Sequence, residues 1–250
     1  GMFSIAISDE ANNKFYLIRD RFGIKPLYYH FNQVKGELCY SSEIQSILKN
    51  PEIKKEANFN EIYYYLNNSM VNSTNKTWFK NINQVESSTY IEFTKNSNLK
   101  VVKYYSINEN IDESLDYSDN TFKYWIEKIR NKFDESFSQH SHFDVNGGIH
   151  LSGGADSTIL AVLANKYRKN LNTYTFDFEE KAYSEVNDAK NISKKFNLKH
   201  KSDILKNDDV ASYLLKVLDI EHEPFSSLRI LCQYHLYEKF QNEVKVIFDG

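Results

Sequence analysis

The sequence predicts an α+β region followed by an α/β region, and three observations support this fold class. First, residues 1–107 contain short apolar runs separated by polar turns, which is typical of strands joined by hairpins. Second, strand-like and helix-like segments alternate after residue 121, and this alternation predicts βαβ units with a parallel sheet. Third, four of the eight glycines fall between residues 147 and 154, so we expect unusual backbone there.

In the first region, we predict strands at 3–7, 15–18, 27–31, 38–41, 89–93 and 99–107, and short helices at 42–48 and 60–66. The next segment, residues 108–120, carries only acidic charges: Glu109, Asp112, Glu113, Asp116 and Asp119. Such a run is usually a solvated linker. It sets the predicted boundary between a domain at 1–107 and a domain at 121–250.

The second region opens with an amphipathic helix between Phe122 and Phe137, whose apolar residues recur at i, i+3, i+4 and i+7 and should face a core. We predict strands after it at 148–151, 172–178, 200–204 and 244–248, and helices at 157–167, 184–196, 208–218 and 226–240. The seven histidines show no metal-type spacing, so structural or solvated roles are expected for them.

The amino-acid composition argues against several classes of protein. The net charge of −3 and the isoelectric point near 6.2 argue against a protein that holds nucleic acid by electrostatics. No run approaches the roughly 20 apolar residues of a membrane helix, so no membrane partner is expected. Cys39 and Cys232 form no disulfide framework and no metal spacing, which suits a reducing compartment such as the cytoplasm. Residues 1–7 lack the features of a signal peptide and are typical of a strand.

The segment 147–157 contains the residues that most clearly indicate a binding function. An apolar strand runs into a Ser-Gly-Gly turn at 152–154, and a helix is expected to open at Asp156 and Ser157. Such an arrangement gathers free backbone N–H groups and the positive end of a helix dipole, and it binds phosphate. The Asp156 carboxylate fits this place if Mg²⁺ bridges it to the phosphates. The alternative is an ordinary strand-to-helix turn with Asp156 or Ser157 as N-cap.

The string Ser-Gly-Gly-x-Asp-Ser is neither a Walker loop nor a dinucleotide-binding fingerprint. It resembles the pyrophosphate loop (PP-loop) of the N-type ATP pyrophosphatases, which cleave ATP between the α and β phosphates and adenylate a carboxylate or carbonyl oxygen. Segment 19–29, followed by 40–44, resembles the closing part of the glutaminase domain in glutamine-dependent asparagine synthetases. Further resemblances to that family, which extend over nearly the whole chain, lie at 1–6, 174–178, 183–185, 223–225, 233–234 and 244–250.

The resemblance implies the C-terminal part of an Ntn-type glutaminase domain, followed by the N-terminal part of an ATP-pyrophosphatase domain of the adenine nucleotide alpha hydrolase type. It implies ATP, Mg²⁺, aspartate and glutamine as ligands, and asparagine made through a β-aspartyl-adenylate with release of AMP and pyrophosphate. Asp156 would bind Mg²⁺, and Glu185 would lie on the substrate or nucleotide side. The implied ATP and pyrophosphate residues are Leu151, Ser152, Gly153, Gly154, Asp156, Ser157, Phe178, Asp249 and Gly250.

The resemblance also implies parts that this sequence does not contain. The family's glutaminase nucleophile is an N-terminal cysteine, whereas this chain begins with Gly1 and has Cys39 inside a strand pattern. No catalytic residue of the glutaminase is therefore present. The family's G-x-D-E acids would follow Gly250. We expect an interior piece of a longer protein, which alone has no glutaminase activity and little or no synthetase activity.

Three alternatives remain open. A family relative that amidates or cyclises another carboxylate in a specialised pathway would keep this architecture. A tRNA-modifying ATP pyrophosphatase would share only residues 152–157 and leave 19–29 as a charged turn before a Pro-started edge strand. A non-catalytic remnant would bind nucleotide without turnover. A homodimer is a candidate assembly, and the sequence does not identify the carboxylate substrate.

Overall fold

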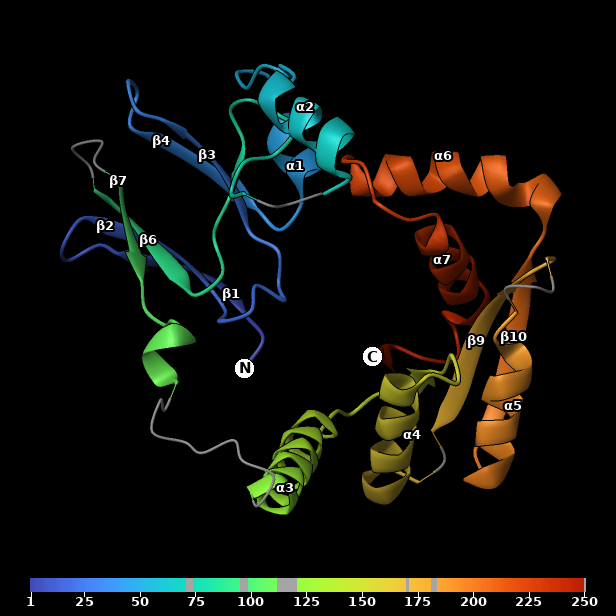
Figure 1. Cartoon of the computed structure of the whole chain (residues 1–250). Coiled ribbons are helices and arrows are strands. Elements are labelled where there is room, and N and C mark those ends of the chain that lie inside the picture. Colours follow the sequence, from blue (N-terminus) through green and yellow to red (C-terminus); the bar gives the residue numbers. More distant parts are fainter. Residues whose placement is uncertain (71–73, 95–98, 112–120, 170, 181–183, 250) are drawn as a thin grey trace. The chain divides into compact units, whose positions relative to one another are not determined.

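The computed structural model describes the whole chain except residues 71–73, 95–98, 112–120, 170, 181–183 and 250. The chain divides into two compact units. The first holds antiparallel sheets and the second a parallel sheet (Figure 1), which confirms the predicted fold class. The units are Gly1–Ser114 with Glu221–Ser226, and Leu115–Ile220 with Ser227–Gly250.

The first unit contains two antiparallel sheets with strand orders β1-β2-β6-β7 and β4-β3-β5. Their strands are β1 (Ser4–Asp9), β2 (Lys14–Arg19), β3 (Tyr28–Asn32), β4 (Glu37–Ser41), β5 (Asn83–Gln84), β6 (Thr89–Thr94) and β7 (Leu99–Lys103). Alternation of apolar and polar residues in β6 buries every second side chain, because successive side chains of a strand point to opposite faces. The helical elements are α1 (Ile44–Leu48), α2 (Phe59–Asn68) and the 3₁₀ turn η1 (Asn108–Asn110).

Two adjacent, buried charged residues, Arg19 and Asp20, hold the turn between β2 and β3 in shape. The Asp20 carboxylate is 1% exposed and accepts four backbone N–H groups, those of Phe3, Phe22, Ile24 and Lys25. The Arg19 guanidinium donates to three carbonyls, those of Gly23, Lys25 and Val85, at 2.6–2.9 Å. In this segment, backbone N–H and C=O groups therefore form hydrogen bonds with side chains instead of with a neighbouring strand. Residues 19–25 thus form a turn that charged side chains hold together, but the strand that follows, β3, lies between β4 and β5 and is not the edge strand that the charged-turn alternative expected.

The segment 221–226 completes the first unit although it is distant in sequence. The Glu223 carboxylate accepts the Trp78 backbone N–H at 2.8 Å, and the Phe225 carbonyl accepts the Tyr65 hydroxyl at 3.0 Å. Glu223 is 9% exposed, and this burial raises the pKa of its carboxyl group, with nearby Glu61 and Glu221 adding to the rise. A buried carboxylate without a cationic partner is costly when it is ionised.

Replacing Glu223 by glutamine is therefore expected to stabilise the first unit at neutral pH. The folded state holds the Glu223 proton at a higher pH than the unfolded chain does, so stability falls as the pH rises through the raised pKa. The glutamine oxygen still accepts the Trp78 N–H, but the side chain carries no charge. Thermal unfolding at pH 7.5 should show a midpoint about 2–4 °C higher for Glu223→Gln, with no gain near pH 4. Glu10→Gln, at an exposed turn, is the control; equal shifts in both variants would contradict the prediction.

The second unit is built on a four-stranded parallel sheet with the order β10-β9-β8-β11. Chain order runs outward from β8 to β9 and β10, and then β11 joins the opposite side of β8. The carboxyl ends of β8 and β11 therefore flank the point where the strand order reverses, which is where open α/β sheets bind ligands. The strands are β8 (Gly147–His150), β9 (Asn172–Phe178), β10 (Lys199–Leu205) and β11 (Val246–Phe248).

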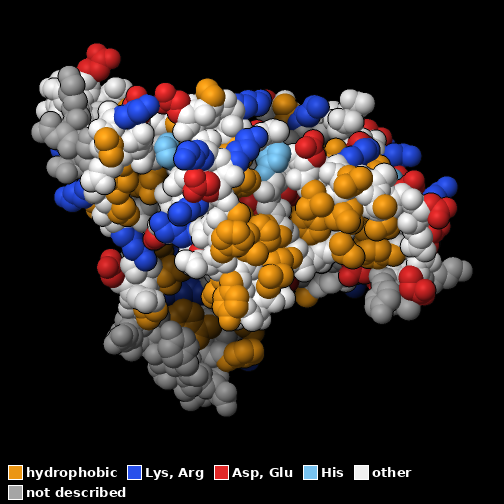
Figure 2. Space-filling model, turned by 90° about the horizontal axis from the view of Figure 1, so that it is seen from above, with side chains coloured by type: hydrophobic (Ala, Val, Ile, Leu, Met, Phe, Trp, Pro, Cys, Tyr) orange, Lys and Arg blue, Asp and Glu red, His pale blue; other side chains and the backbone are white. Residues whose placement is uncertain are grey.

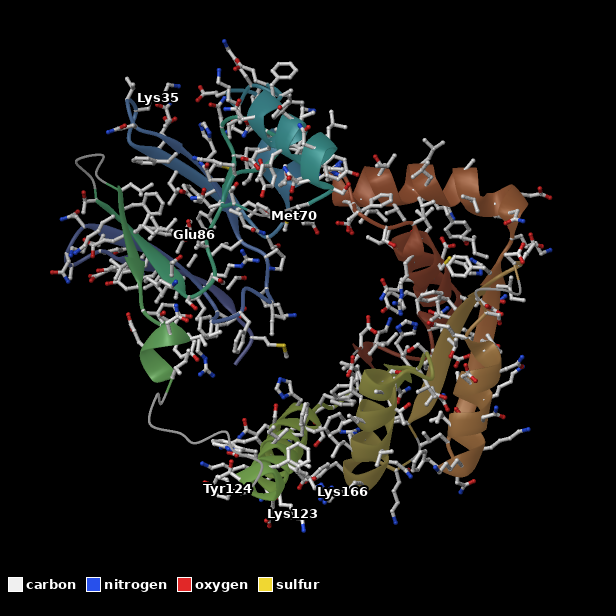
Figure 3. The ribbon with its side chains drawn as sticks, in the orientation of Figure 1. Lys35, Met70, Glu86, Lys123, Tyr124 and Lys166 are labelled. Atoms are coloured by element: carbon white, nitrogen blue, oxygen red, sulfur yellow. The ribbon has the colours of Figure 1, made fainter. Side chains whose placement is uncertain are left out.

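Five helices and one 3₁₀ turn accompany this sheet among the described residues: α3 (Phe122–His140), α4 (Ala155–Tyr167), α5 (Val186–Lys195), η4 (Asn207–Asp209), α6 (Val210–Glu221) and α7 (Arg229–Phe240). Lys166 near the end of α4 forms an ion pair with Asp134 of α3 at 2.6 Å, and Figure 3 labels this lysine at that end of α4. The core of the unit gathers apolar residues of the sheet and of the adjoining helices, including Ile149, Leu151, Ala161 and Ala164.

The predicted apolar stripe of α3 does not face a core along its length. Only Phe137 is buried, while Phe122, Ile129 and Phe133 are at least half exposed. The reason is that α3 meets α4 through its last turns, where Phe137 stacks on Tyr167. Periodicity reports which residues share a face, and it does not report whether another element covers that face.

A further apolar surface lies on α6, where Leu215, Leu218 and Ile220 are exposed. Figure 2 shows hydrophobic side chains gathered on the face of the molecule that is seen from above.

No helix in the described part of the chain is long and apolar enough to cross a membrane. Several histidines have partners in the fold: among them, His235 lies 3.1 Å from Asp203, and His200 lies 3.1 Å from the Thr173 hydroxyl.

Candidate nucleotide site

The candidate site is the turn that joins β8 to α4. Leu151, which follows β8, is fully buried, donates its N–H to the Tyr174 carbonyl at 2.8 Å and accepts the Thr175 hydroxyl. Helix α4 begins at Ala155, two residues earlier than predicted, and its N-cap is Gly154 without a side-chain cap. The alternative that made Asp156 or Ser157 the N-cap is therefore wrong, because both residues already lie in the first helical turn.

Two serine hydroxyl groups tie the turn together. The Ser152 and Ser157 hydroxyl oxygens lie 3.0 Å apart, and the Ser157 hydroxyl is buried, where it accepts the Ser152 N–H at 3.3 Å. The Ser152 hydroxyl in turn accepts the Gly154 N–H at 3.3 Å. These contacts fix the conformation of the loop.

Several backbone N–H groups of this loop are available to a ligand. The N–H groups of Gly153, Ala155 and Asp156 have no acceptor among the described residues. They lie at the N-terminal end of α4, where the helix dipole is positive. Free N–H groups at such an end are suited to the oxygens of a phosphate or pyrophosphate group.

Gly153 is the residue that lets the loop come this close to its neighbours. Its φ is +88°, and a Cβ atom built there would lie 2.7 Å from the Asp188 Cβ and 3.1 Å from the Ala189 nitrogen. The first turn of α5 therefore packs directly against Gly153. Glu185, predicted on the substrate or nucleotide side, is exposed immediately before α5 and is its N-cap residue.

The Asp156 carboxylate is exposed in the first turn of α4 and makes no hydrogen bond or ion pair with any residue that the structure describes. No group of three or more His, Cys, Asp or Glu side chains in the described part of the chain is arranged to hold a metal ion. A single free carboxylate still fits Mg²⁺, because this ion keeps several waters and is bound by one or two carboxylates together with substrate phosphates.

Asp249 lies beside the loop because β11 pairs in parallel with β8. Phe248 is in register with Ile149, so the next residues along the two strands, Asp249 and His150, come together at the sheet's edge. Their side chains meet at 2.8 Å between Nδ1 and Oδ1. Gly250, the last of the predicted nucleotide residues, lies outside the described residues.

Phe178 ends β9, the neighbouring strand, and is half-buried. Its ring packs edge to face on Phe176 at 6.0 Å. Phe176 in turn stacks on His150 at 4.9 Å and lies 5.2 Å from the Arg229 guanidinium. The structure thus places Phe178 at the same edge of the sheet as the loop, and it adds Phe176 and His150, for which the sequence predicted no role in the site.

The two cysteines lie in different environments. Cys232 of α7 is buried, and this burial, with the negative charge of Asp177 adding to it, raises the pKa of the thiol to about 11. The thiolate that cysteine chemistry requires is scarce at such a pKa. Cys39 lies in β4 opposite His30, which confirms its predicted position in a strand.

Two family models match the two units. The model described as "Glutamine amidotransferase domain" matches residues 1–105, and the model described as "Asparagine synthase" matches residues 128–250. The chain belongs to the glutamine-hydrolysing asparagine synthetase family. The resemblance in residues 19–29 and 152–157 is thereby confirmed, and both halves of the chain take part in it.

Curated relatives of the asparagine synthetase family agree with this assignment. Asparagine synthetase [glutamine-hydrolyzing] 2 of Bacillus subtilis is 34% identical over 70% of the chain. Asparagine synthetase [glutamine-hydrolyzing] 1 of the same organism is 24% identical over 100% of it. The chain spans 24% and 38% of the lengths of these two relatives.

The similarity of the chain to solved structures is weaker than its similarity to the curated relatives. The NH3-dependent NAD synthetase from Campylobacter jejuni superposes with a TM-score of 0.35 at 17% identity, over 48% of this chain and 54% of that one. The family assignment therefore rests on the sequence matches. The turn between β8 and α4 lies within the residues that the "Asparagine synthase" model matches.

Proposed function

We propose that this chain is the segment of an asparagine synthetase in which the glutaminase half meets the ATP-using half. The protein would make asparagine from aspartate, ATP and glutamine-derived ammonia, and would release AMP and pyrophosphate. The observation that carries the proposal is the geometry of the loop at 152–157, where three N–H groups beside the start of α4 have no acceptor within the described part of the chain. The relatives of the chain are glutamine-hydrolysing asparagine synthetases by name, which supports these substrates.

In the proposed reaction, the free N–H groups of the loop hold the β and γ phosphates of ATP and leave the α phosphorus exposed to attack. A carboxylate oxygen of aspartate bonds to that phosphorus, and the bond to pyrophosphate breaks. Ammonia then attacks the acyl carbon of the β-aspartyl-adenylate, AMP departs with its oxygen, and the amide loses a proton. The loop contributes by positioning and by stabilising negative charge, which is how proteins accelerate phosphate chemistry.

Asp156 would hold Mg²⁺, since it is a free carboxylate next to the proposed phosphate site. The ion, when bound, neutralises charge on the phosphates. Leu151 fixes the start of the loop by its two backbone contacts with β9, and Phe178 would border the nucleotide from that strand. We also propose the cytoplasm as the location and a homodimer as the assembly, with aspartate, glutamine and ATP as small-molecule ligands.

Aspartate-dependent exchange of labelled pyrophosphate into ATP is the test of this function. The assay uses the complete product of the gene that encodes this chain, because adenylation is reversible and exchange reports that step alone. We expect Asp156→Asn to lower the exchange rate by at least about 100-fold, since a neutral amide binds Mg²⁺ poorly. Asp144→Asn changes another exposed aspartate of the same unit and should leave exchange unchanged.

Other outcomes point to the remaining alternatives. Exchange with a different carboxylate and none with aspartate would assign the chain to a relative that amidates or cyclises another substrate. ATP binding without exchange on any carboxylate would indicate a nucleotide-binding remnant. Wild-type exchange that Asp156→Asn leaves intact would remove Asp156 from the proposed site.

A further inference from the structure

A chain of polar contacts links the interior of the parallel sheet to its carboxyl edge. His150, the last residue of β8, is 2% exposed, and its Nδ1 lies 2.8 Å from Oδ1 of Asp249. The other carboxylate oxygen of Asp249 accepts the side-chain amide of Gln233 from α7 at 2.8 Å. Each oxygen of one carboxylate is therefore held by a side chain from a different element.

The imidazole of His150 is itself fixed. Its ring stacks on Phe176 at 4.9 Å with an angle of 28° between the planes, and its backbone pairs with Tyr174 in the sheet. A carboxylate only accepts hydrogen bonds, so the hydrogen of the 2.8 Å contact belongs to Nδ1 of His150. A buried ring with one fixed N–H is a rigid anchor for a carboxylate.

Asp249 stands at the other end of this contact and is much more open. Its side chain is 43% exposed, and β11 places it next to the strand that leads into the PP-loop. An aspartate there adds a negative charge close to where the proposed function places the phosphates of ATP. Two hydrogen-bond donors disperse that charge and fix its direction, and such charge-assisted bonds are stronger than neutral ones.

We infer that His150 is a positioning residue, which together with Gln233 holds the Asp249 carboxylate in the one orientation that is compatible with bound ATP. The inference rests on the proposed nucleotide site. Without the imidazole, Oδ1 of Asp249 loses its interior donor while Gln233 still holds Oδ2. The less restrained carboxylate can then turn toward the PP-loop and repel the phosphates. The effect should fall on ATP binding and should leave the binding of the carboxylate substrate unchanged.

The test compares His150→Leu with His150→Asn in the complete gene product, with pyrophosphate exchange as the readout. Leucine removes the donor, whereas the asparagine amide can present an N–H near the place of Nδ1. We expect His150→Leu to raise the KM for ATP about tenfold or more, which corresponds to a lost hydrogen bond to a charged group. His150→Asn should stay within about threefold of wild type. The KM for the carboxylate substrate should change in neither variant. His142→Leu, at an exposed histidine of the same unit, is the matched control.

A double-mutant cycle separates this role from simple packing. In the background of Asp249→Ala, the change His150→Leu should have no further effect on the KM for ATP, because the two residues act as one unit. Additive effects, or equal losses in the leucine and asparagine variants, would overturn the inference. Because His150 is buried, Gln233→Leu provides a second variant at a half-exposed position. It should raise the KM for ATP in the same direction, and an unchanged KM would count against the inference.

The contact also has a spectroscopic signature that does not depend on turnover. In ¹⁵N NMR spectra of the protein, the His150 Nδ1–H should be protected from exchange, and Asp249→Ala should abolish that protection. Persistence of the protected signal in Asp249→Ala would overturn the inference. If wild-type protein shows no exchange of pyrophosphate while the NMR result holds, the proposed function fails and the hydrogen bond between His150 and Asp249 stands.

Discussion

Gly153→Ala is expected to weaken ATP binding strongly and to destabilise the second unit. Alanine rarely adopts a φ of +88°, and its Cβ would lie 2.7 Å from the Asp188 Cβ and 3.1 Å from backbone atoms of α5. Backbone atoms of a helix cannot give way as the end of a flexible side chain can. Either the loop or α5 must move, which costs about 1–3 kcal/mol in folding free energy, as overpacked sites generally do. The displaced loop would no longer aim its free N–H groups at one point.

Titration calorimetry with ATP and Mg²⁺, together with urea unfolding, measures both effects on one sample. We expect the affinity for ATP to fall by at least about 100-fold, which matches the loss of several charge-assisted hydrogen bonds. Gly154→Ala is the stability control, because Gly154 has a φ of −68° and its nearest neighbour to a new Cβ is the Ser152 hydroxyl at 3.3 Å. That variant should unfold at nearly the wild-type urea concentration. Wild-type affinity and stability in Gly153→Ala would show that the loop tolerates a side chain.

Asp20→Asn is expected to destabilise the first unit by about 3–5 kcal/mol. The carboxylate accepts four backbone N–H groups, and asparagine offers one oxygen, so the two N–H groups that Oδ2 or Oδ1 served lose their acceptor. Each buried donor left without a partner costs about 1–3 kcal/mol. The substitution keeps the shape of the side chain, so lost packing does not contribute.

The dependence of this loss on pH distinguishes it from a general defect. Burial by itself would raise the pKa of Asp20, but the N–H groups of Lys25, Ile24, Phe22 and Phe3 outweigh burial and lower it. A lowered folded pKa gives stability above the ordinary carboxyl pKa, and this stability is lost as the pH falls through the folded value. The gap between wild type and Asp20→Asn in urea unfolding should therefore be full at pH 7 and shrink below about pH 4. Asp9→Asn, at the end of β1, is the control and should lose much less stability, because the Asp9 carboxylate makes its hydrogen bonds with Asn12 at the surface; a similar loss in both variants would refute this account.

The strands and most helices could be predicted from the sequence because their signals are local. The pattern of residues 172–178 predicts β9 with the bounds that the structure gives, since threonine and aromatic residues are typical of strands. β5, a two-residue strand at Asn83–Gln84, is too short to leave such a pattern. The apolar stripe of α3 was visible in the sequence, but its exposure depends on which elements lie opposite it.

Some parts of the candidate site could be predicted from the sequence and others could not. Residues 152–157 could be identified from the sequence, because glycines and hydroxyl residues between a strand and a helix are typical of a phosphate-binding turn. The pairing of His150 with Asp249 could not be read, since the two residues are 99 positions apart and meet only because β11 pairs with β8. The burial of Arg19 and Asp20 also runs against residue type, and only the hydrogen bonds of the turn explain it.

The return of residues 221–226 to the first unit has a practical consequence for dissecting the protein. No single cut of the chain separates the two units, because the first unit is assembled from two stretches of sequence. A fragment that ends before the acidic segment would leave the Trp78 N–H and the Tyr65 hydroxyl without the acceptors that Glu223 and Phe225 provide. A short peptide with the sequence of residues 221–226, added separately, would be the natural means of restoring that fragment.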